Sequence, residues 1–298
     1  MAGGTHICLH KFEAVLTFEA IQKHKINYCL FVPTMINMML NYPDFSKHDF
    51  TSMKTCIYGG DPMPEALMLQ AMQKLPSWSF YQIYGMTEAG GFATMLRWRD
   101  HHPTGKGSGK LRSAVQPAIG VALQIRRLDG TVADTAEIGE NAVRSDAIMI
   151  DYLGNDEATR AVLKEGWVHT GDGGYVDDDG YLFIVDRIKD MIVSGGENVY
   201  SVEVERALYS HPAVREAAVI GIPHELWGEV VHAVVVVKVG AVATAEELVA
   251  HCRLSIAGYK IPRSIEFRSE ALPMTPVGKI REIVLREPWW KGAARNVN

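Results

Sequence analysis

Ser79-Phe80-Tyr81-Gln82-Ile83-Tyr84-Gly85-Met86-Thr87-Glu88 is an apolar stretch that runs into a glycine, a hydroxyl group and a carboxylate. The residues before Gly85 predict a strand, and Gly85 lets the backbone approach a ligand closely. Thr87 and Glu88 suit a phosphate and a divalent cation, because Mg²⁺ prefers carboxylate and phosphate oxygens. Taken alone, the stretch is more typical of an ordinary turn at the end of a strand.

The segments around this stretch alternate strand and helix over residues 1–98. Strands are expected at His6–Leu9 and Tyr28–Val32, and helices at Thr17–His24 and Glu65–Lys74. This alternation is typical of βαβ units with a largely parallel sheet. Because the chain enters its first strand abruptly, we expect only part of an α/β subdomain here.

Residues 99–186 have short apolar segments and frequent turn residues, beginning with a segment of loop composition at 99–111. Asp-Gly dipeptides at 129–130 and 179–180 mark turns, and the acidic run 177–180 predicts a hairpin. The run is no calcium loop, because its aspartates are consecutive and no glutamate follows at the twelfth position. We expect a β-rich subdomain.

Residues 187–298 are expected to form a small α+β domain. Val202–Tyr209 has a helical pattern that stops at a His-Pro pair, and strands are expected at Ala217–Ile222 and Val230–Val237. Thr244, followed three residues later by Glu247, predicts a capping box at the start of another helix.

The bulk composition excludes some classes of function. A net charge of −5 provides no general field for polyanions, so no nucleic-acid partner is expected. The four scattered cysteines form no CxxC pair and are expected to be reduced. No signal peptide or transmembrane segment is evident, since the longest apolar run, 230–239, is too short to span a bilayer. We expect a cytoplasmic protein.

Two glycine-containing motifs each have a binding interpretation and a structural one. Gly59-Gly60-Asp61-Pro62 follows a strand and forms either a backbone wall for a planar base or a strand-to-helix turn. Asp172, in Thr-Gly-Asp before the acidic hairpin, suits the two hydroxyl groups of a ribose, because one carboxylate can accept both hydrogen bonds. A solvated turn carboxylate is the alternative.

Two further motifs lie in the last third of the chain. Residues 186–190 alternate acidic and basic side chains before a glycine pair at 195–196, a pattern that also fits a solvated linker and a helix lead-in. A Pro/Gly loop at 273–278 presents Lys279, although a single exposed lysine commonly has no special role.

The order of these motifs is more specific than any one of them. Tyr-Gly-x-Thr-Glu is followed by Thr-Gly-Asp, Asp-Arg-x-Lys, Gly-Gly-Glu-Asn and Gly-Lys. This order resembles the adenylate-forming superfamily of acyl-CoA synthetases, aryl-CoA ligases, beetle luciferases and peptide-synthetase adenylation domains. The resemblance covers essentially the whole chain, and its Gly-Gly-Glu-Asn-Val-Tyr and Arg-Glu-Pro-Trp-Trp segments are similar to acyl- or aryl-CoA ligases.

The resemblance implies a fold and a reaction. The fold is an α/β subdomain plus a β-rich subdomain, followed by a small mobile α+β domain, with the N-terminal part of the large domain missing. The reaction is that of an acid–thiol ligase, which joins a carboxylate to the α-phosphate of ATP, releases pyrophosphate and passes the acyl group to coenzyme A. ATP or AMP, Mg²⁺ and coenzyme A are the implied cofactors, and the acid is a fatty or aryl acid.

The resemblance also implies roles for residues of the large domain. Gly59, Gly60 and Asp61 would line the adenine, and Tyr84 would stack on it. Gly85 and Met86, which follow Tyr84 in the same motif, would also belong to the nucleotide-binding site. Asp172 would take the ribose hydroxyls, with Arg187 near ribose and phosphate. Thr87 would contact phosphate and Glu88 would hold the metal ion.

Residues of the last domain receive roles from the same resemblance. Lys189 matches the hinge about which the small domain swings between half-reactions. Lys279 matches the lysine that contacts the carboxylate and α-phosphate, where a positioned cation stabilises developing charge. A lysine on a mobile domain can then leave and clear space for the thiol. Ser194, Gly195 and Gly196 would line the pantetheine channel after the swing.

The chain departs from the family pattern at several points. No counterpart is found of the Ser/Thr/Gly-rich loop that grips the β- and γ-phosphates, and Gly105–Lys110 is no Walker A loop, because Thr104 and Leu111 replace required residues. Val115 and Asp151 stand where Gly is usual, which would strain a turn of positive φ. Apolar surface that the missing half covers is expected to be exposed.

Three interpretations of the chain remain open on the sequence. The first is a ligase with impaired autonomous adenylation, active alone or beside a missing N-terminal half or a second copy. The second is a truncated, non-catalytic paralogue that binds AMP, acyl-AMP or coenzyme A. The third is an incomplete reading frame with no independent role. Retention of Glu88, Asp172, Lys189 and Lys279 favours the enzyme, and Gly90-Gly91 favours a roomy acyl pocket.

Overall fold

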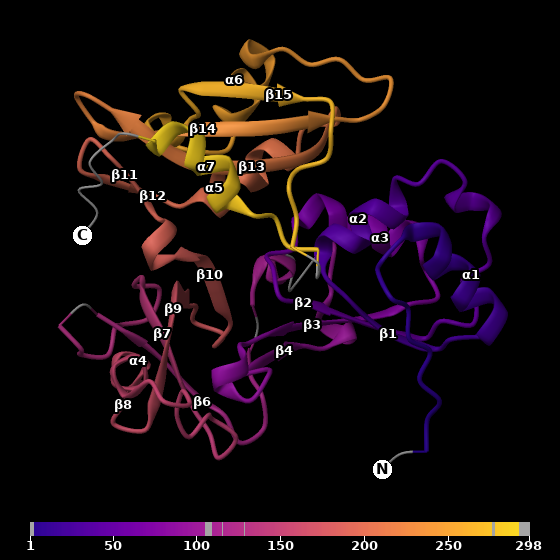
Figure 1. Ribbon diagram of the computed structural model, residues 1–298, viewed down its shortest axis with the longest axis horizontal. Coiled ribbons are helices and arrows are strands. Elements are labelled where there is room, and N and C mark those ends of the chain that lie inside the picture. Colours follow the sequence, from indigo (N-terminus) through magenta and orange to yellow (C-terminus); the bar gives the residue numbers. More distant parts are fainter. Residues whose placement is uncertain (1–2, 105–108, 115, 128, 276–277, 292–298) are drawn as a thin grey trace.

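The computed structural model describes residues 3–104, 109–114, 116–127, 129–275 and 278–291, which form three lobes. Figure 1 shows an α/β lobe in indigo and purple, a β-rich lobe in magenta, and a small lobe in orange and yellow that lies across the other two. Each lobe is built on one sheet of five strands.

The α/β lobe contains the first sheet, whose strand order is β1-β2-β3-β4-β5. Its first three strands are parallel, and the last two are antiparallel. The strands are β1 Tyr28–Phe31, β2 Thr55–Gly59, β3 Ser79–Tyr84, β4 Thr94–Leu96 and β5 Gln116–Pro117; the helices are α1 Ala14–His24, α2 Pro33–Leu40 and α3 Glu65–Lys74, with short 3-10 turns η1 Phe45–Lys47, η2 Thr87–Ala89 and η3 Trp98–Asp100.

Most of the predicted elements of this lobe are confirmed, and one is wrong. Helix α3 has its predicted bounds, and β1 ends one residue early. Helix α1 begins at Ala14 rather than Thr17, because Ala14, Phe18 and Ile21 lie on one buried face at helical spacing. His6–Leu9 forms no strand, because its residues are exposed and pair with no strand of the described chain. The alternation of apolar and helical segments was therefore not enough to predict a strand here.

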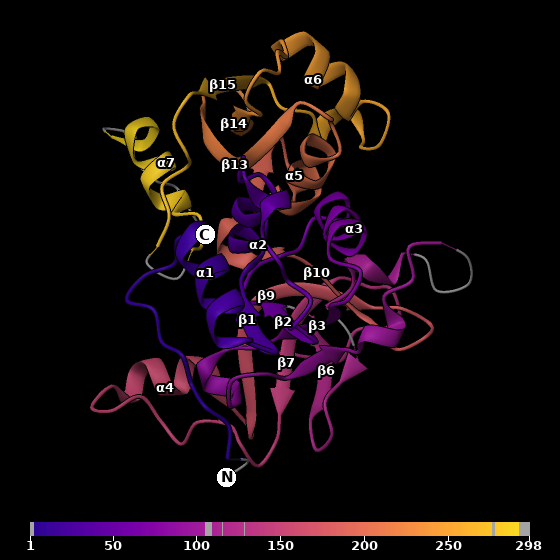
Figure 2. The same ribbon diagram turned by 90° about the vertical axis from the view of Figure 1, so that its right-hand side faces the viewer.

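The first sheet is covered on one face only. Helices α1 to α3 bury alternate residues such as Phe31, which is 6% exposed, in the main core of the lobe. Figure 2 shows α2 and α3 between this sheet and the small lobe. On the opposite face Tyr28 and Leu30 are 54% and 56% exposed. Parallel strands are usually covered on both faces, whereas these two side chains leave apolar surface exposed on this face.

The β-rich lobe contains an antiparallel sheet with strand order β10-β9-β7-β6, and β8 pairs with β9. The predicted hairpin is confirmed: β9 and β10 are joined through residues 177–181, with Gly180 at a positive φ. The elements are β6 Ala122–Arg126, β7 Gly139–Arg144, α4 Asp156–Val162, β8 Leu163–Lys164, β9 Trp167–Val176 and β10 Leu182–Arg187.

The segment before this lobe returns to the first sheet. Strand β5 pairs with β4, and Leu111 in the 3-10 turn η4 Lys110–Arg112 lies in the core of the α/β lobe. Residues 105–108 of the Walker-like stretch and Val115 lie outside the described residues. Asp151 does not adopt a positive φ, so the strain expected there is absent.

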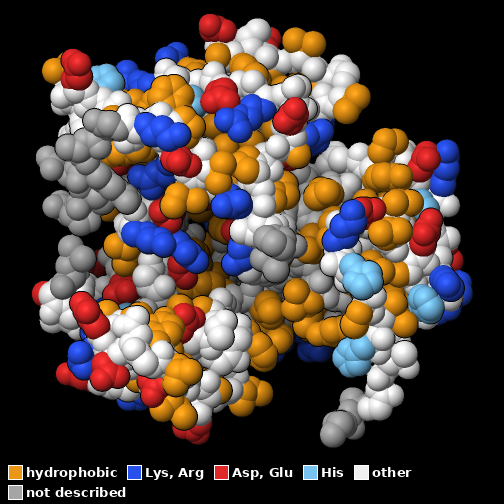
Figure 3. Space-filling view, in the orientation of Figure 1, with side chains coloured by type: hydrophobic (Ala, Val, Ile, Leu, Met, Phe, Trp, Pro, Cys, Tyr) orange, Lys and Arg blue, Asp and Glu red, His pale blue; other side chains and the backbone are white. Residues whose placement is uncertain are grey.

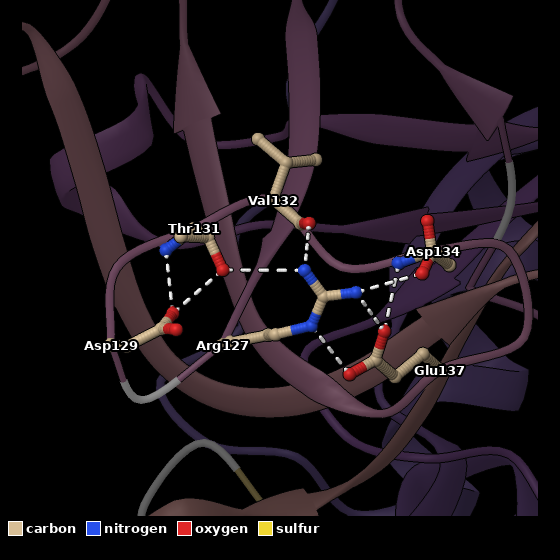
Figure 4. A network of polar contacts seen from close by, with 6 residues as sticks. All are labelled: Arg127, Asp129, Thr131, Val132, Asp134 and Glu137. Carbon is tan, nitrogen blue, oxygen red and sulfur yellow. Dashed lines mark hydrogen bonds and ion pairs between the residues drawn. The ribbon is translucent and has the colours of Figure 1, made fainter.

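Arg127 organises the turn that follows β6 (Figure 4). Its guanidinium group donates to both carboxylate oxygens of Glu137, to Asp134, and to the oxygens of Thr131 and Val132. All three of its nitrogens are thereby occupied, so this arginine, which lines the cleft described below, holds the turn together.

The small lobe contains the third sheet, with order β12-β11-β14-β13 and β15 parallel to β14. The predicted helix α5 and the two long strands are confirmed, and the capping box of Thr244 and Glu247 is formed. The elements are η5 Ile188–Asp190, β11 Ile192–Ser194, β12 Glu197–Val199, α5 Ser201–Tyr209, β13 Val214–His224, β14 Gly228–Val237, α6 Ala245–Cys252, η6 Gly258–Lys260, β15 Ser264–Arg268 and α7 Glu282–Trp290.

Among the helices of the described chain, none has both the length and the apolar character needed to cross a bilayer.

Candidate active site

A cleft of about 1950 Å³ lies where the three lobes meet. Figure 3 shows it as a hollow between the lobes, with both basic and acidic side chains at its rim. Its lining includes most of the residues singled out in the sequence: Gly60, Asp61, Tyr84, Gly85, Met86, Thr87, Glu88, Asp172, Arg187, Lys189 and Lys279. Gly60 and Lys279, which are 219 positions apart in the chain, thus lie at one site.

The turn after β3 contributes Thr87 and Glu88. The chain leaves the sheet at Tyr84, and residues 87–89 form the 3-10 turn η2. Gly85 lines the cleft, and it also allows close packing, because a Cβ atom on it would lie 2.5 Å from the Phe92 Cα atom. A glycine is therefore needed here for the close approach between two backbone segments.

Asp172 on β9 lies at the centre of a polar group in the cleft. The Tyr84 hydroxyl donates to Asp172 Oδ2 over 2.7 Å, and Asn141 Nδ2 donates to the same hydroxyl oxygen over 3.4 Å. Arg187 Nε lies 3.6 Å from Asp172 Oδ1. Burial raises the pKa of Asp172, while the Tyr84 hydrogen bond, Arg187 and Lys279 lower it.

The end of β2 forms another wall of the cleft. Gly60, at a positive φ, and Asp61 line it, whereas Gly59 does not. Gly59 lies against β3, where a Cβ atom would come within 2.2 Å of the Ile83 carbonyl oxygen. Burial raises the pKa of Asp61 to about 6, against the opposing effect of Lys279 and Arg187.

Lys279 reaches the cleft from the small lobe. A Cβ atom on Gly60 would lie 3.5 Å from Lys279 Cε and 3.8 Å from its Nζ. The turn before it is closed by a hydrogen bond from the Thr275 N–H to the Lys279 carbonyl over 2.7 Å, and the Thr34 hydroxyl donates to the Gly278 carbonyl. Pro276 and Val277 of this loop lie outside the described residues.

The junction of the lobes contains Lys189, which is exposed in η5. Hydrogen bonds connect the small lobe to the α/β lobe. Asn37 Nδ2 on α2 donates to the Arg215 carbonyl over 2.9 Å, and Arg206 on α5 donates to the Arg112 carbonyl over 3.4 Å. These contacts stabilise the arrangement in which Lys279 lies over Gly60.

Carboxyl groups from both sides of the interface also line the cleft. Burial raises the pKa of Asp186 to about 6 and that of Glu282 to about 8, and it raises the pKa of Glu205 well above its usual range. The negative charges of Asp186, Asp190 and Asp61 add to the effect on Glu282. Burial in the cleft therefore favours the protonated forms of these three carboxyl groups, relative to solvated ones.

Ser194, Gly195 and Gly196 lie outside the cleft. They form the turn between β11 and β12 on the small lobe, where Gly195 and Gly196 have positive φ and open space around their Cα atoms. The structure thus separates these three residues from the other predicted site residues in this arrangement of the lobes.

Two family models match the chain: that of the AMP-binding enzymes over residues 1–153 and that of their C-terminal domain over residues 203–279. The chain belongs to the AMP-binding enzyme family. The break between the two matched regions includes η5 and Lys189, at the junction of the lobes.

Relatives of this AMP-binding enzyme have named activities. It is 39% identical to the fatty acid–[acyl-carrier-protein] ligase ScoC of Streptomyces coeruleorubidus, over 100% of this chain and 56% of the relative. It is 39% identical to a feruloyl-CoA synthase of an Amycolatopsis species, over 94% of this chain and 55% of the relative. The chain therefore spans about half the length of these curated relatives.

Solved structures of the family support the fold. The anthranilate CoA ligase AuaEII, in complex with anthranoyl-AMP, superimposes with a TM-score of 0.84 at 31% identity, over 93% of this chain and 52% of that one. The adenylate-forming enzyme fold expected from the sequence is confirmed.

The residues of this AMP-binding enzyme fit a metal ion only together with a ligand. In the parts that the structure describes, no group of three or more His, Cys, Asp or Glu residues is arranged to hold a metal. Glu88 contributes a single carboxylate group to the lining of the cleft. Mg²⁺ is commonly bound by one or two carboxylates plus substrate phosphates, so Glu88 fits that mode and no protein-only cage.

Two polar residues outside the sequence motifs contact residues of the site. Tyr152 donates its hydroxyl to Glu88 Oε1 over 2.7 Å, and Asn141 contacts the Tyr84 hydroxyl. Both lie in ordinary-looking segments of the β-rich lobe. Only the three-dimensional arrangement brings them to the turn after β3, so the spacing of residues in the sequence contains no signal for them.

Proposed function

We propose that this chain carries the adenylate site of an ATP-dependent acid–thiol ligase. The ligase would activate a carboxylic acid as its acyl-adenylate and then transfer the acyl group to the thiol of coenzyme A. The observation that supports this most strongly is the meeting of Lys279, from the small lobe, with Gly60, Asp61 and Asp172, from the large lobes, in one cleft.

The first half-reaction needs a nucleotide pocket and a cation at the reacting phosphate. In this proposal, Asp172 accepts hydrogen bonds from both ribose hydroxyls, Gly60 and Asp61 border the adenine, and Tyr84 stacks on it. A carboxylate oxygen of the acid bonds to the α-phosphorus while the bond to pyrophosphate breaks. Lys279 stabilises the negative charge that develops on the α-phosphoryl oxygens.

The phosphates leave through the side of the cleft that holds Thr87, Glu88 and Arg187. Thr87 would donate its hydroxyl to a phosphate oxygen, and Glu88 would hold Mg²⁺, which neutralises charge on the departing pyrophosphate. Arg187, 3.6 Å from Asp172 and exposed at the edge of the cleft, would contact both ribose and phosphate.

The second half-reaction needs a different arrangement of the lobes. Lys279 occupies the cleft here, and the turn of Ser194, Gly195 and Gly196 lies outside it. A rotation about Lys189 would withdraw the lysine and bring the glycine turn to the acyl-adenylate. The thiol sulfur would then bond to the acyl carbon, with AMP as the leaving group.

The class of acid is proposed from the relatives, whose printed names include a fatty acid and ferulate. A fatty or aryl acid is therefore the substrate to test first. Gly90 adds no support for a roomy pocket, because it lies at a positive φ with Ala147 directly against it: a Cβ atom would be 2.7 Å from the Ala147 carbonyl oxygen. Gly91 has open space around it.

The two half-reactions of this chain are expected to differ in rate. The 298 residues contain no counterpart of the Ser/Thr/Gly-rich loop for the β- and γ-phosphates, whereas the residues proposed for acyl-AMP and for the swing are present. We therefore expect thioester formation from preformed acyl-AMP and coenzyme A to exceed acid-dependent ATP–pyrophosphate exchange, relative to a full-length ligase.

The test assays both half-reactions of this chain with a fatty acid and with an aryl acid. Thioester formation from acyl-AMP supports the ligase. Acyl-AMP binding without conversion in either assay supports the alternative, a non-catalytic adenylate-binding paralogue. Equal and severe loss of both activities contradicts the expected difference between the half-reactions.

A further inference from the structure

Glu88 has a hydrogen-bond donor that lies outside the motifs named in the sequence analysis. The hydroxyl group of Tyr152 donates to Glu88 Oε1 over 2.7 Å, across 64 positions in the sequence. Tyr152 lies between β7 and α4 in the β-rich lobe, and Glu88 lies in η2 of the α/β lobe. The contact therefore connects two lobes at the cleft.

This contact is one of three between the same two segments. The Met149 N–H donates to the Glu88 carbonyl oxygen over 2.8 Å. Gly90 lies so close to Ala147 that a Cβ atom on it would be 2.8 Å from the Ala147 Cβ atom. Residues 147–152 therefore contact both the backbone and the side chain of the turn at 88–90.

Tyr152 itself is held by the start of α4. Its N–H donates to Thr159 Oγ1 over 3.0 Å, and its carbonyl oxygen accepts from the Asn155 N–H over 3.0 Å. The Asn155 side chain caps α4 by accepting from the Ala158 N–H over 3.1 Å. Because the tyrosine backbone is fixed at both its N–H and its C=O, its hydroxyl presents a well-defined donor to Glu88.

The chemistry of the contact suits a carboxylate that binds a cation. A neutral hydroxyl donor can hold one carboxylate oxygen without adding positive charge beside it. It occupies Oε1 and restrains rotation of the carboxylate, which leaves Oε2 for a metal ion. Donors that orient metal-binding side chains typically contribute 10–100-fold to metal affinity.

We propose that Tyr152 is a positioning residue, which orients the Glu88 carboxylate for the Mg²⁺ of the nucleotide complex. The proposal rests on the function proposed above, in which Glu88 holds that ion. It predicts that the Tyr152 hydroxyl affects the metal dependence of nucleotide binding and leaves metal-free nucleotide binding unchanged.

The experiment uses this chain with the non-hydrolysable analogue α,β-methylene-ATP and with Mn²⁺ as the probe for the metal site. Analogue binding is measured by calorimetry without metal and across a Mn²⁺ series, and bound Mn²⁺ is counted by electron paramagnetic resonance. The variants are Tyr152→Phe, Glu88→Gln and the double variant. Tyr28→Phe, which removes a hydroxyl from the exposed face of the first sheet, is the matched control.

Tyr152→Phe should raise the half-saturating Mn²⁺ concentration about tenfold and leave metal-free affinity unchanged. Added to Glu88→Gln, it should have no further effect, because both changes act on one interaction. A metal effect in the original chain that Tyr152→Phe leaves intact overturns the positioning role alone. Equal weakening with and without metal also overturns it, since a merely structural role predicts that result. Absence of any Mn²⁺ effect in the original chain overturns the metal role of Glu88 and this proposal together.

Discussion

The hydroxyl group of Tyr84 donates a 2.7 Å hydrogen bond to the Asp172 carboxylate, which joins the end of β3 in the α/β lobe to β9 in the β-rich lobe. Tyr84 follows an apolar strand, and Asp172 precedes an acidic hairpin. Their contact means that the two motifs proposed for adenine and ribose form one continuous surface of the cleft.

Nucleotide affinity should depend on Asp172. Hydrogen bonds to a charged group contribute about 1.5–3 kcal/mol each, so losing the ribose contacts in Asp172→Ala should weaken AMP binding at least about tenfold. Calorimetric titration with AMP provides the measurement. Asp178→Ala, in the exposed hairpin turn, is the control and should bind AMP as the original chain does. If both variants bind alike, the ribose assignment is wrong.

Stability should fall with rising pH because of Glu282. Burial, together with the charges of Asp186, Asp190 and Asp61, raises the pKa of this carboxyl to about 8 from an ordinary 4.5. Below about 4.5 both the folded and unfolded states hold the proton. Between about 4.5 and about 8 only the unfolded state loses it freely, so the free energy of unfolding decreases as pH rises.

Glu282→Gln removes this titration. The melting temperature of the variant, relative to that of the original chain, should therefore increase between pH 5 and pH 9. Thermal unfolding at several pH values measures it, with Glu287→Gln on the exposed side of α7 as the control. A difference between Glu282→Gln and the original chain that does not change with pH contradicts the raised pKa.

Substitutions of Lys279 and Lys189 should impair different half-reactions. Lys279→Ala removes the cation proposed for the first transition state, so acid-dependent pyrophosphate exchange should drop on the order of 10²–10³-fold. Thioester formation from acyl-AMP should be spared. Lys189→Pro fixes φ at the proposed hinge and should do the reverse. Assays of each half-reaction measure this, and matching defects in both variants contradict the separation of roles.

The two faces of β1 should respond differently to substitution. Phe31→Ala should destabilise the chain by about 3–5 kcal/mol, because it opens a cavity in the main core of the α/β lobe. Leu30→Ala, one residue earlier on the exposed face, should change stability by less than about 0.5 kcal/mol. Urea unfolding gives both values. A large loss for Leu30→Ala would show that this face is covered in solution.

The sequence predicted the elements whose signal is local. Helix α3, the hairpin before Tyr181 and the capping box of Thr244 follow from spacing, turn residues and side-chain caps, and the structure contains all three. The predicted strand at His6–Leu9 is absent because a strand needs a partner strand, and the pattern of a short apolar segment does not indicate whether one is present.

The site was predictable in its motifs and not in its supporting contacts. The order of the motifs identified the family, and the cleft brings together Tyr84, Glu88, Asp172 and Lys279. Tyr152 was not predictable, because its role depends on how the loop before α4 lies against η2. Gly59 and Gly85 were both assigned to ligand contact; Gly85 lines the cleft and Gly59 does not, and each allows close packing against a neighbouring backbone segment.

The most direct test of the central claim is calorimetric binding of a non-hydrolysable acyl-adenylate, such as an acyl-sulfamoyl adenosine, to this chain. The account predicts one site per chain, with affinity reduced at least about tenfold in Asp172→Ala and reduced in Lys279→Ala as well. It also predicts tighter binding than that of AMP alone, because the acyl carboxyl end would lie beside Lys279. No binding, or binding that neither substitution weakens, would contradict the claim that this cleft is an acyl-adenylate site.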